Sequence, residues 1–361
     1  MSDSNLEMFL VDASASIVEA MKKIDENTQG ILFIVDEKRH LIGSVTDGDI
    51  RRWLIKTGEL SAKVLQFMNA VPKYLCSGDR DKAKSYMREY RLRALPILDS
   101  DRNVREIVFN SEIECNVTDK KKGSMAHTPV IIMAGGQGNR LYPYTKILPK
   151  PLIPIGDIPI IERIMNCFCE YGVSKFYLTV NYKKSMIKSY FSELRHPYSI
   201  VYVEEEKPLG TAGSMKLIPQ KFECPVMITN CDVLIEADYE SILDFHKESR
   251  NDLTIVSALK NVVVPYGVLH AKEEGIITAM EEKPRLSYFV NTGMYILNPK
   301  WIEEIPNDTF FHMTDLAGLL MNRGARVGMY PISEDSFLDM GELEEMRRME
   351  KKLNLKSEQE K

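Results

Sequence analysis

The chain has 361 residues, of which 44% are hydrophobic and 27% are charged, as expected for a folded protein of two domains. Its formal net charge of −5 argues against a protein that coats nucleic acid or lies on a membrane surface. No apolar run approaches the ~20 residues of a membrane-spanning helix, and the polar, acidic start does not resemble a signal peptide. Six cysteines without C-x-x-C spacing indicate reduced thiols rather than a zinc site. We therefore expect a cytoplasmic protein with no nucleic-acid or membrane partner.

The first third of the chain contains an internal repeat with a period of 63 residues, the separation of Asp36 and Asp99. The segment that begins at Gly30 is echoed by the segment that begins at Arg93. Each contains two apolar runs that read as a strand pair, preceded by an apolar-periodic helix. We expect two helix–strand–strand–helix units, each of which buries one face against the other.

This repeat resembles a CBS-domain pair over residues 1–114. The resemblance implies a G-x-x-T-x-x-D motif in each copy, whose Thr and Asp contact the phosphate and ribose of a nucleotide. The first copy is complete, with Gly43, Thr46 and Asp49. The second copy is broken, with Glu106, Phe109 and Glu112 at the matching positions. Two interpretations stay open: the pair senses a regulatory nucleotide through Thr46 and Asp49, or it is only a scaffold for docking and dimerisation.

Residues 115–128 are polar, lysine-rich and aperiodic, which predicts a linker. From residue 129 onward strands alternate with helices, which predicts a doubly wound, mainly parallel α/β domain. The expected strands are 130–133, 175–180, 200–203 and 226–228. The expected helices are 159–171, 183–194 and a surface helix after Asp339. In such sheets ligands bind beyond the carboxyl ends of the strands.

The first of these strands runs into a loop with three glycines, Gly135, Gly136 and Gly138, which is followed by Arg140 and Lys150. Glycines let backbone N–H groups approach a phosphate closely. The two cations add positive charge that suits a polyphosphate. The spacing fits neither the G-x-x-x-x-G-K-[ST] phosphate loop nor the G-x-G-x-x-G dinucleotide fingerprint. The loop therefore predicts a phosphate site of another kind.

The stretch from Gly135 to Leu152 resembles the signature of the sugar-1-phosphate nucleotidylyltransferases, G-G-x-G-T-R-L-x-P-x-T-x-x-x-P-K-P-L, with Asn139 in place of the usual threonine. The resemblance implies a Rossmann-like, GT-A-type catalytic domain at residues 129–361. Its reaction joins an NTP to a sugar-1-phosphate and releases pyrophosphate. Both substrates are anions, so the site must supply positive charge and in-line positioning. The resemblance assigns these roles to the loop that begins at Ala134, and to Arg140 and Lys150.

Two aspartates are the metal ligands that the resemblance implies. Asp232 ends the apolar strand in M-I-T-N-C-D-V-L, which is similar to N-G-D-x-L with Cys231 in place of the glycine. Asp339 lies in F-L-D-M-G, which is similar to W-x-D-x-G with Phe337 in place of the tryptophan. Hard divalent cations take oxygen ligands, so we expect Mg²⁺ as the cofactor and Asp232 as a catalytic residue.

The segment V-E-E-E-K-P-L-G-T-A-G-S-M, residues 203–215, is similar to the part of the family that lies beside the nucleobase. Gly210 would let the backbone approach the base, and Glu205 stands where relatives place the base-reading side chain. An ionised carboxylate accepts two parallel hydrogen bonds and donates none. Guanine offers two adjacent donors, whereas uracil and thymine offer one, so the pattern favours GTP. The alternative is that the acidic run is a solvated turn.

The sugar-phosphate side is implied by three short motifs in family order. Glu282 and Lys283 lie in E-K-P, in which the lysine reaches a phosphate and the glutamate a sugar hydroxyl. Asn291 and Gly293 lie in N-x-G-x-Y, which lines the sugar pocket. Gly267 lies in a Y-G-V turn that presents a backbone amide to the hexose.

The two-part architecture resembles the guanylyltransferases of legionaminic acid biosynthesis, which implies glucosamine-1-phosphate or a related hexose-1-phosphate as the acceptor. The alternatives are a mannose- or heptose-1-phosphate guanylyltransferase, or a thymidylyl-, uridylyl- or cytidylyltransferase. A different class is a nucleotide-sensing regulatory protein whose transferase half only binds. CBS pairs associate in twos, so we expect a homo-oligomer.

Overall fold

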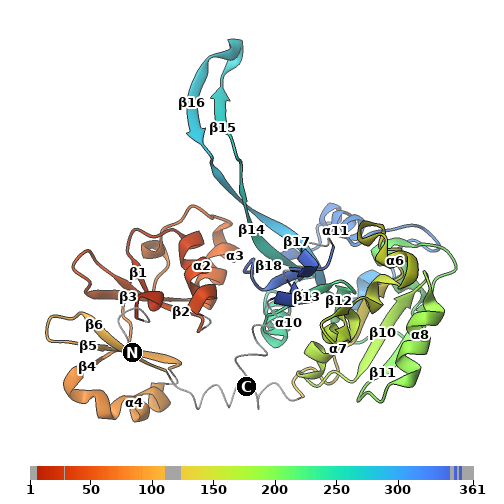
Figure 1. The fold of residues 1–361 in the computed structure, drawn as a ribbon, viewed down its shortest axis with the longest axis horizontal. Coiled ribbons are helices and arrows are strands. Elements are labelled where there is room, and N and C mark those ends of the chain that lie inside the picture. Colours follow the sequence, from red (N-terminus) through yellow and green to blue (C-terminus); the bar gives the residue numbers. More distant parts are fainter. Residues whose placement is uncertain are drawn as a thin grey trace. The chain divides into compact units, whose positions relative to one another are not determined.

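The computed structural model describes residues 6–27, 29–90, 92–109, 123–341, 345–347 and 349–351 (Figure 1). The chain divides into two compact units, Met1–Asp119 with Leu259–Tyr288, and Lys120–Ala258 with Phe289–Lys361. Within the described ranges, no helix combines the length and the apolar character that a crossing of the bilayer requires.

The first unit contains two similar three-stranded sheets, each with one parallel and one antiparallel strand pair. The first sheet consists of β1 (Leu10–Asp12), β2 (Ile31–Val35) and β3 (Leu41–Thr46), with helices α2 (Ile17–Asn27) and α3 (Asp47–Thr57). The second consists of β4 (Leu75–Cys76), β5 (Ala94–Leu98) and β6 (Val104–Phe109), with helix α4 (Ala83–Tyr90). Short 3-10 helices complete the two copies: η1 (Glu7–Phe9), η2 (Val64–Gln66) and η3 (Ser77–Lys82).

The predicted repeat is present, and it extends to the turns. Asp36 and Asp99 directly follow β2 and β5, and each carboxylate accepts a backbone hydrogen bond from the residue four positions on, at 2.8 and 2.9 Å. The residue three positions on is left-handed in both copies, with φ of 69° at Arg39 and 67° at Arg102. The same turn therefore closes both hairpins, as the shared Asp predicts.

The first unit also includes a two-stranded antiparallel ribbon of β15 (Gly267–Ala271) and β16 (Ile277–Glu282), visible in Figure 1. The 3-10 turn η7 (Glu273–Gly275) joins the two strands. The sequence analysis recognised motifs here but no strands. Every residue of β16 is exposed, so burial leaves no alternating signal that would reveal the strand.

The second unit is built on a seven-stranded sheet in the order β11-β10-β7-β12-β17-β14-β18. Its strands are β7 (Val130–Ala134), β10 (Lys175–Val180), β11 (Ser199–Glu204), β12 (Val226–Asn230), β14 (Leu253–Val263), β17 (Arg285–Leu297) and β18 (Val327–Ile332). The pairs β11–β10, β10–β7, β7–β12 and β14–β18 are parallel, whereas β12–β17 is antiparallel. The prediction of a mainly parallel α/β sheet is confirmed, with β17 as the strand that runs against its neighbour.

Smaller elements complete this unit. The helices are α6 (Tyr144–Ile147), α7 (Ile160–Cys169), α8 (Lys184–Glu193), α9 (Gly210–Gly213), α10 (Tyr239–Glu248) and α11 (Met313–Asn322). The 3-10 helices are η4 (Asn139–Leu141), η5 (Lys150–Leu152), η6 (Ser214–Leu217) and η8 (Pro299–Ile302). Two small sheets pair β8 (Pro154–Ile155) with β9 (Ile158–Pro159), and β13 (Val233–Ile235) with β19 (Phe337–Asp339).

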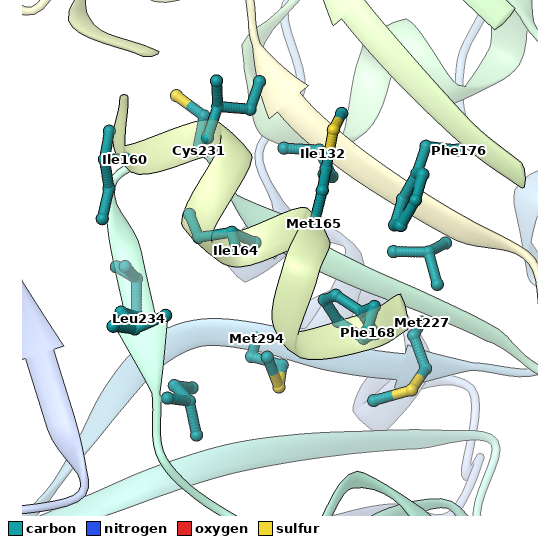
Figure 2. Packing of buried hydrophobic residues seen from close by; sticks show 14 of the residues in the cluster. Ile132, Ile160, Ile164, Met165, Phe168, Phe176, Met227, Cys231, Leu234 and Met294 are labelled. Atoms are coloured by element: carbon teal, nitrogen blue, oxygen red, sulfur yellow. The ribbon is translucent and has the colours of Figure 1, made fainter. Parts of the chain in front are cut away.

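Both faces of the central sheet are buried, because successive side chains of a strand point to opposite sides. In β7, Val130 and Ile132 belong to a cluster with helices α7, α8 and α10, whereas Ile131 and Met133 belong to a cluster with α11. Figure 2 shows the first cluster, in which the apolar face of α7 packs against the strands. Helices on both faces make the domain doubly wound, as predicted.

Some predicted boundaries were wrong by a few residues. The helix expected at 159–171 is Ile160–Cys169, because the chain turns before the left-handed Gly172. The strand before Asp232 ends at Asn230. The described end of the expected linker, 123–128, forms turns, and Met125 there is only 1% exposed. Its N–H bonds the Tyr171 carbonyl at 3.0 Å, so this part packs on the second unit. Of the helix expected after Asp339, residues 345–347 and 349–351 are helical.

Candidate active site

The glycine loop leaves the carboxyl end of β7 and turns back on itself at Gly138. This residue has φ of 69°, which a side chain disfavours. A Cβ there would also lie 2.9 Å from Thr145 Cγ2 and 3.0 Å from Lys150 Cβ. The third glycine of the signature thus lets the loop lie directly against Lys150, twelve residues further along the chain.

Lys150 and Asp232 form a buried ion pair. Lys150 is the first residue of η5, and Asp232 follows β12, so the two come from segments far apart in the sequence. Their side chains are only 10% and 12% exposed. The sequence analysis assigned Lys150 to the triphosphate and Asp232 to the metal. In the structure these two candidate residues are in direct contact.

Asp339 lies beside this pair. It is the last residue of β19, where it is the register partner of Val233, and the N–H of Met340 bonds the Asp232 carbonyl at 2.9 Å. Burial raises the pKa of Asp339 above its ordinary value, and the charge of Asp232 raises it further. Its Oδ1 is buried and makes no hydrogen bond within the part of the chain that the structure describes. A carboxylate whose pKa is raised by burial and by a second carboxylate is stabilised in its charged form by a nearby cation.

Arg140 lies near the carboxylate of Asp339. A Cβ on Gly341 would lie 3.0 Å from Asp339 Oδ2 and 3.2 Å from Arg140 Nη1, so both groups flank this glycine. Arg140 is exposed, whereas Lys150 is buried. The structure therefore brings Arg140, Lys150, Asp232 and Asp339 together, and places them next to the glycine loop.

The donor set fits Mg²⁺ bound together with a phosphate. Among the described residues no group of three or more His, Cys, Asp and Glu side chains could hold a metal ion alone. Mg²⁺ characteristically takes one or two carboxylates and fills its other positions with water and substrate phosphate. Asp339 Oδ1, which has no hydrogen-bond partner among the described residues, would supply one such ligand, and Asp232 would supply another if Lys150 moved away.

Cys231, which replaces the family glycine, does not belong to this set. Its side chain is 7% exposed and packs in the cluster under α7 (Figure 2). Burial, and secondarily the charge of Asp232, raise the pKa of its thiol to about 12. The thiol therefore stays protonated at neutral pH and serves as a small apolar group.

Glu205 directly follows β11 and is 5% exposed, so it is not part of a solvated turn. Its Oε2 accepts a hydrogen bond from Leu209 N at 3.1 Å, and a Cβ on Gly135 would lie 2.6 Å from its Oε1. Burial raises its pKa, which the bonds from Leu209 and Ser214 partly offset. By contrast, the half-exposed Glu204 is paired with two lysines. The carboxylate that was expected to read the base therefore lies against the glycine loop.

The predicted sugar residues are divided between the two units. Asn291 and Gly293 lie on β17, where Gly293 N bonds Asn291 Oδ1 at 3.0 Å and Asn291 Nδ2 bonds Tyr295 Oη at 2.7 Å. Gly293 also lies against Asn230, two residues before Asp232. Gly267 and Glu282 pair with each other in the ribbon of the first unit, and Lys283 directly follows β16. All three of those residues are exposed.

Thr46 and Asp49, the candidate nucleotide ligands of the first CBS copy, are hydrogen-bonded to each other. They form a capping box at the start of α3, with Thr46 Oγ1 donating to Asp49 Oδ2 at 2.6 Å. Asp49 also pairs with Arg52 at 2.5 Å. In the second copy Glu106 accepts two bonds from Arg80, each at 2.6 Å. Glu112 lies outside the described residues.

Sequence reasoning missed two supports of the site. Lys183 donates to the carbonyls of Lys146 and Ile147 at 2.6 and 2.7 Å, and so satisfies two carbonyl groups at the C-terminal end of α6. Residues 309–313 bond the segment that contains Gly210. A short-range pattern could have suggested only the start of α11, where Asp315 completes a capping box.

The site lies beyond the carboxyl ends of parallel strands, which is where open α/β proteins bind their ligands. A family model described as "Nucleotidyl transferase" matches residues 129–355, and a model described as "CBS domain" matches residues 4–56. The chain is therefore a member of the nucleotidyl transferase family. Its transferase domain is preceded in the same chain by a CBS domain.

The relatives include proteins named mannose-1-phosphate guanyltransferase. Those from Debaryomyces hansenii and Candida albicans are each 35% identical over 184 residues, which is 48% of this chain and 51% of each relative. The chain thus spans about half the length of these relatives. Among solved structures, HddC from Yersinia pseudotuberculosis is similar with a TM-score of 0.50 and 26% identity, over 63% of this chain and 99% of HddC.

Proposed function

We propose that the second unit transfers a guanylyl group from GTP to a sugar-1-phosphate and releases pyrophosphate. The observation that carries this proposal is the convergence of Lys150, Asp232 and Asp339 beside the glycine loop. A protein that only sensed a nucleotide would have no need of a buried Asp232 beside the half-buried Asp339, whose Oδ1 is buried and has no hydrogen-bond partner in the part of the chain that the structure describes. That arrangement suits a reaction in which negative charge builds up on transferring and leaving phosphates.

In this proposal the chain's own groups divide the work. Backbone N–H groups from Ala134 to Gly138 and the exposed guanidinium of Arg140 bind the β- and γ-phosphates. Lys150 moves its charge from Asp232 to the phosphates as pyrophosphate leaves. Asp232 and Asp339 would hold Mg²⁺, which when bound supplies Lewis-acid charge beside the α-phosphate. The sugar-1-phosphate oxygen attacks the α-phosphorus directly, so that the P–O bond to pyrophosphate breaks as the new P–O bond forms.

The preference for guanine rests on Glu205. Its burial makes hydrogen bonds to a ligand strong, because water does not compete for the carboxylate. Guanine N1–H and N2–H can satisfy both oxygens, whereas uracil would turn a carbonyl toward one of them. The relatives named mannose-1-phosphate guanyltransferase support the same base.

For the acceptor we propose a hexose-1-phosphate held by Asn291 and Gly293 of the second unit, whereas the roles of Gly267, Glu282 and Lys283 of the first unit stay predictions. Glucosamine-1-phosphate is the candidate that the two-part architecture suggests. Mannose-1-phosphate is a second candidate, which the names of the relatives favour. A regulatory nucleotide at Thr46 and Asp49, and a homo-oligomer formed through the CBS pair, stay predictions.

The experiment is a pyrophosphate-release assay with each of GTP, ATP, UTP and CTP against a panel of sugar-1-phosphates in the presence of Mg²⁺. We expect the highest kcat/KM with GTP and an acceptor among the hexosamine and hexose 1-phosphates. Preference for UTP would contradict the guanine assignment. Nucleotide binding without pyrophosphate release would contradict the transferase assignment and favour a sensor.

A further inference from the structure

The nucleobase loop, residues 209–213, cannot hold its own shape. Its only regular structure is the four-residue helix α9 (Gly210–Gly213), and a helix this short is not stable without packing. It also begins with the left-handed Gly210, φ 77°, which adds conformational freedom in the absence of support. Something outside the loop must therefore fix this backbone, which the proposed function places beside the base.

That support is residues 309–313, which we call the base-loop brace. Phe311 N donates to Leu209 O at 2.9 Å, and Phe311 O accepts from Ala212 N and Gly213 N at 2.9 and 3.0 Å. The two main chains are in contact, since a Cβ on Gly210 would lie 2.6 Å from Phe311 O. Three backbone hydrogen bonds thus join two segments that lie about a hundred residues apart in the chain.

Side chains complete the connection at Thr211 and His312. Thr211 Oγ1 accepts from Met313 N at 3.0 Å, which leaves its hydroxyl hydrogen free to point at His312 Nδ1, 3.4 Å away. Thr211 N donates to the same nitrogen at 3.4 Å. Nδ1 therefore acts as an acceptor, so the neutral ring carries its hydrogen on Nε2. The ring is flanked edge-to-face by Phe310, with centroids 4.7 Å apart.

The brace is anchored in the core, so it can impose its position on the loop. Met313, Leu316 and Leu320 of α11 are at most 1% exposed and pack in the cluster on one face of the sheet. Asp315 caps this helix by accepting from His312 N at 2.8 Å. The surface pair of Lys207 with Asp308 joins residues just before the two segments, but its side chains are 54% and 77% exposed, and such pairs contribute little to stability.

We propose that His312 is a positioning residue for the nucleotide. Through its contact with Thr211, His312 fixes the nucleobase loop, and the Leu209 N–H of that loop donates a hydrogen bond to Glu205. The connection is continuous, from His312 to Thr211, along residues 209–213, and from Leu209 N to Glu205 Oε2 at 3.1 Å. Loss of His312 should therefore weaken recognition of the base and leave the phosphate chemistry at Lys150 and Asp232 intact. This inference rests on the proposed guanylyl transfer for the identity of the base.

The test compares His312→Ala, His312→Asn and Asp315→Ala in the full chain. Asparagine places an acceptor oxygen near the position of Nδ1 and is a good helix N-cap, so it should preserve the bond to Thr211. Asp315→Ala is the matched control, because it removes the cap of the same helix without touching Thr211. Steady-state KM and kcat for GTP and for the sugar-1-phosphate are measured, together with equilibrium binding of a fluorescent GTP analogue.

We expect His312→Ala to raise KM and the dissociation constant for GTP about tenfold, the effect of losing a hydrogen bond or two, with kcat and the KM of the sugar-1-phosphate within about twofold. His312→Asn should restore most of the affinity, and Asp315→Ala should lower Tm without changing KM for GTP. Unchanged GTP affinity in His312→Ala, or equal loss for both substrates, would overturn the inference. If the wild type binds GTP but releases no pyrophosphate, the proposed function fails and the binding comparison still decides the role of His312. A wild type that binds no GTP would overturn both.

Discussion

Replacing Lys150 with methionine removes the ammonium group that faces Asp232 and keeps a side chain of similar length. Both side chains are nearly buried, at 10% and 12% exposed, so the remaining carboxylate would keep its charge where water barely reaches it. Removing one partner of a buried ion pair in this way costs roughly 3–5 kcal/mol. At about 2–4 °C per kcal/mol for a unit of this size, Tm should fall by roughly 6–20 °C in metal-free buffer at neutral pH.

A second substitution separates the loss of the pair from the loss of packing. Lys150→Met with Asp232→Asn removes both charges, so the double variant should be more stable than Lys150→Met alone. Lys247→Met is the control, because Lys247 pairs with Asp244 at 3.8 Å while both are more than half exposed, and its loss should cost less than about 1 kcal/mol. Thermal scans of the four proteins supply the values. A Lys150→Met variant as stable as the Lys247 control, or no recovery in the double variant, would refute the reasoning.

The same substitution has a consequence for metal binding. With Lys150 gone, a divalent cation no longer competes with an ammonium group for Asp232. We expect Lys150→Met to bind Mn²⁺, a spectroscopic substitute for Mg²⁺, at least about tenfold more tightly than the wild type in the absence of nucleotide, or about 1.4 kcal/mol. Electron paramagnetic resonance of free Mn²⁺ gives both dissociation constants. Equal affinities would mean that Lys150 does not occupy the cation position.

Three further changes test other parts of the account. Gly138→Ala should cost more than about 1 kcal/mol of folding stability, because it puts a Cβ on a left-handed residue beside Lys150, whereas Gly136→Ala, with no atom within 4 Å of its Cβ, should cost little in the same denaturation assay. Glu205→Gln should lower the ratio of kcat/KM for GTP to kcat/KM for UTP roughly tenfold or more. Because burial raises the pKa of Glu205, the same substitution should also raise Tm of the nucleotide-free protein at pH 7–8. This rise in Tm should vanish below pH 4.5, where the carboxyl group is protonated in both the folded and the unfolded chain. Burial lowers the pKa of His246 from 6.5 to about 4, so the stability that the neutral ring contributes is present above pH 6.5 and is lost as pH falls toward 4, about 2 kcal/mol of it by pH 5. In urea titrations, His246→Asn should therefore reduce the loss of folding stability between pH 7 and 5. An unchanged dependence of stability on pH would exclude His246 as its source.

Features that depend on neighbouring residues, such as single strands and hairpin turns, could be predicted from the sequence. The strand at 175–180 was placed to the residue, because it is a compact apolar run that follows a glycine turn. The repeat was visible because Asp36 and Asp99 perform the same local task, each closing a hairpin through bonds within four residues. Signals of this kind are contained in a few neighbouring residues, so a pattern can reveal them.

The sequence could not predict what depends on distant segments. The contact of Lys150 with Asp232 joins residues 82 positions apart, and that of Thr211 with His312 joins residues 101 apart. Nothing in hydrophobic periodicity sets such distances, which follow from the order of strands in the sheet. The burial of Glu205 is of the same kind, because two exposed-looking glutamates flank it in the sequence and only the fold distinguishes them.

The most direct measurement of the central claim is phosphorus NMR of the full chain with GTP, Mg²⁺ and either glucosamine-1-phosphate or mannose-1-phosphate. The account predicts that one of the two reactions gives pyrophosphate and a GDP-sugar in equal amounts, and that Asp232→Asn gives neither product at a comparable rate. Release of inorganic phosphate without a GDP-sugar, or an Asp232→Asn variant as active as the wild type, would contradict it.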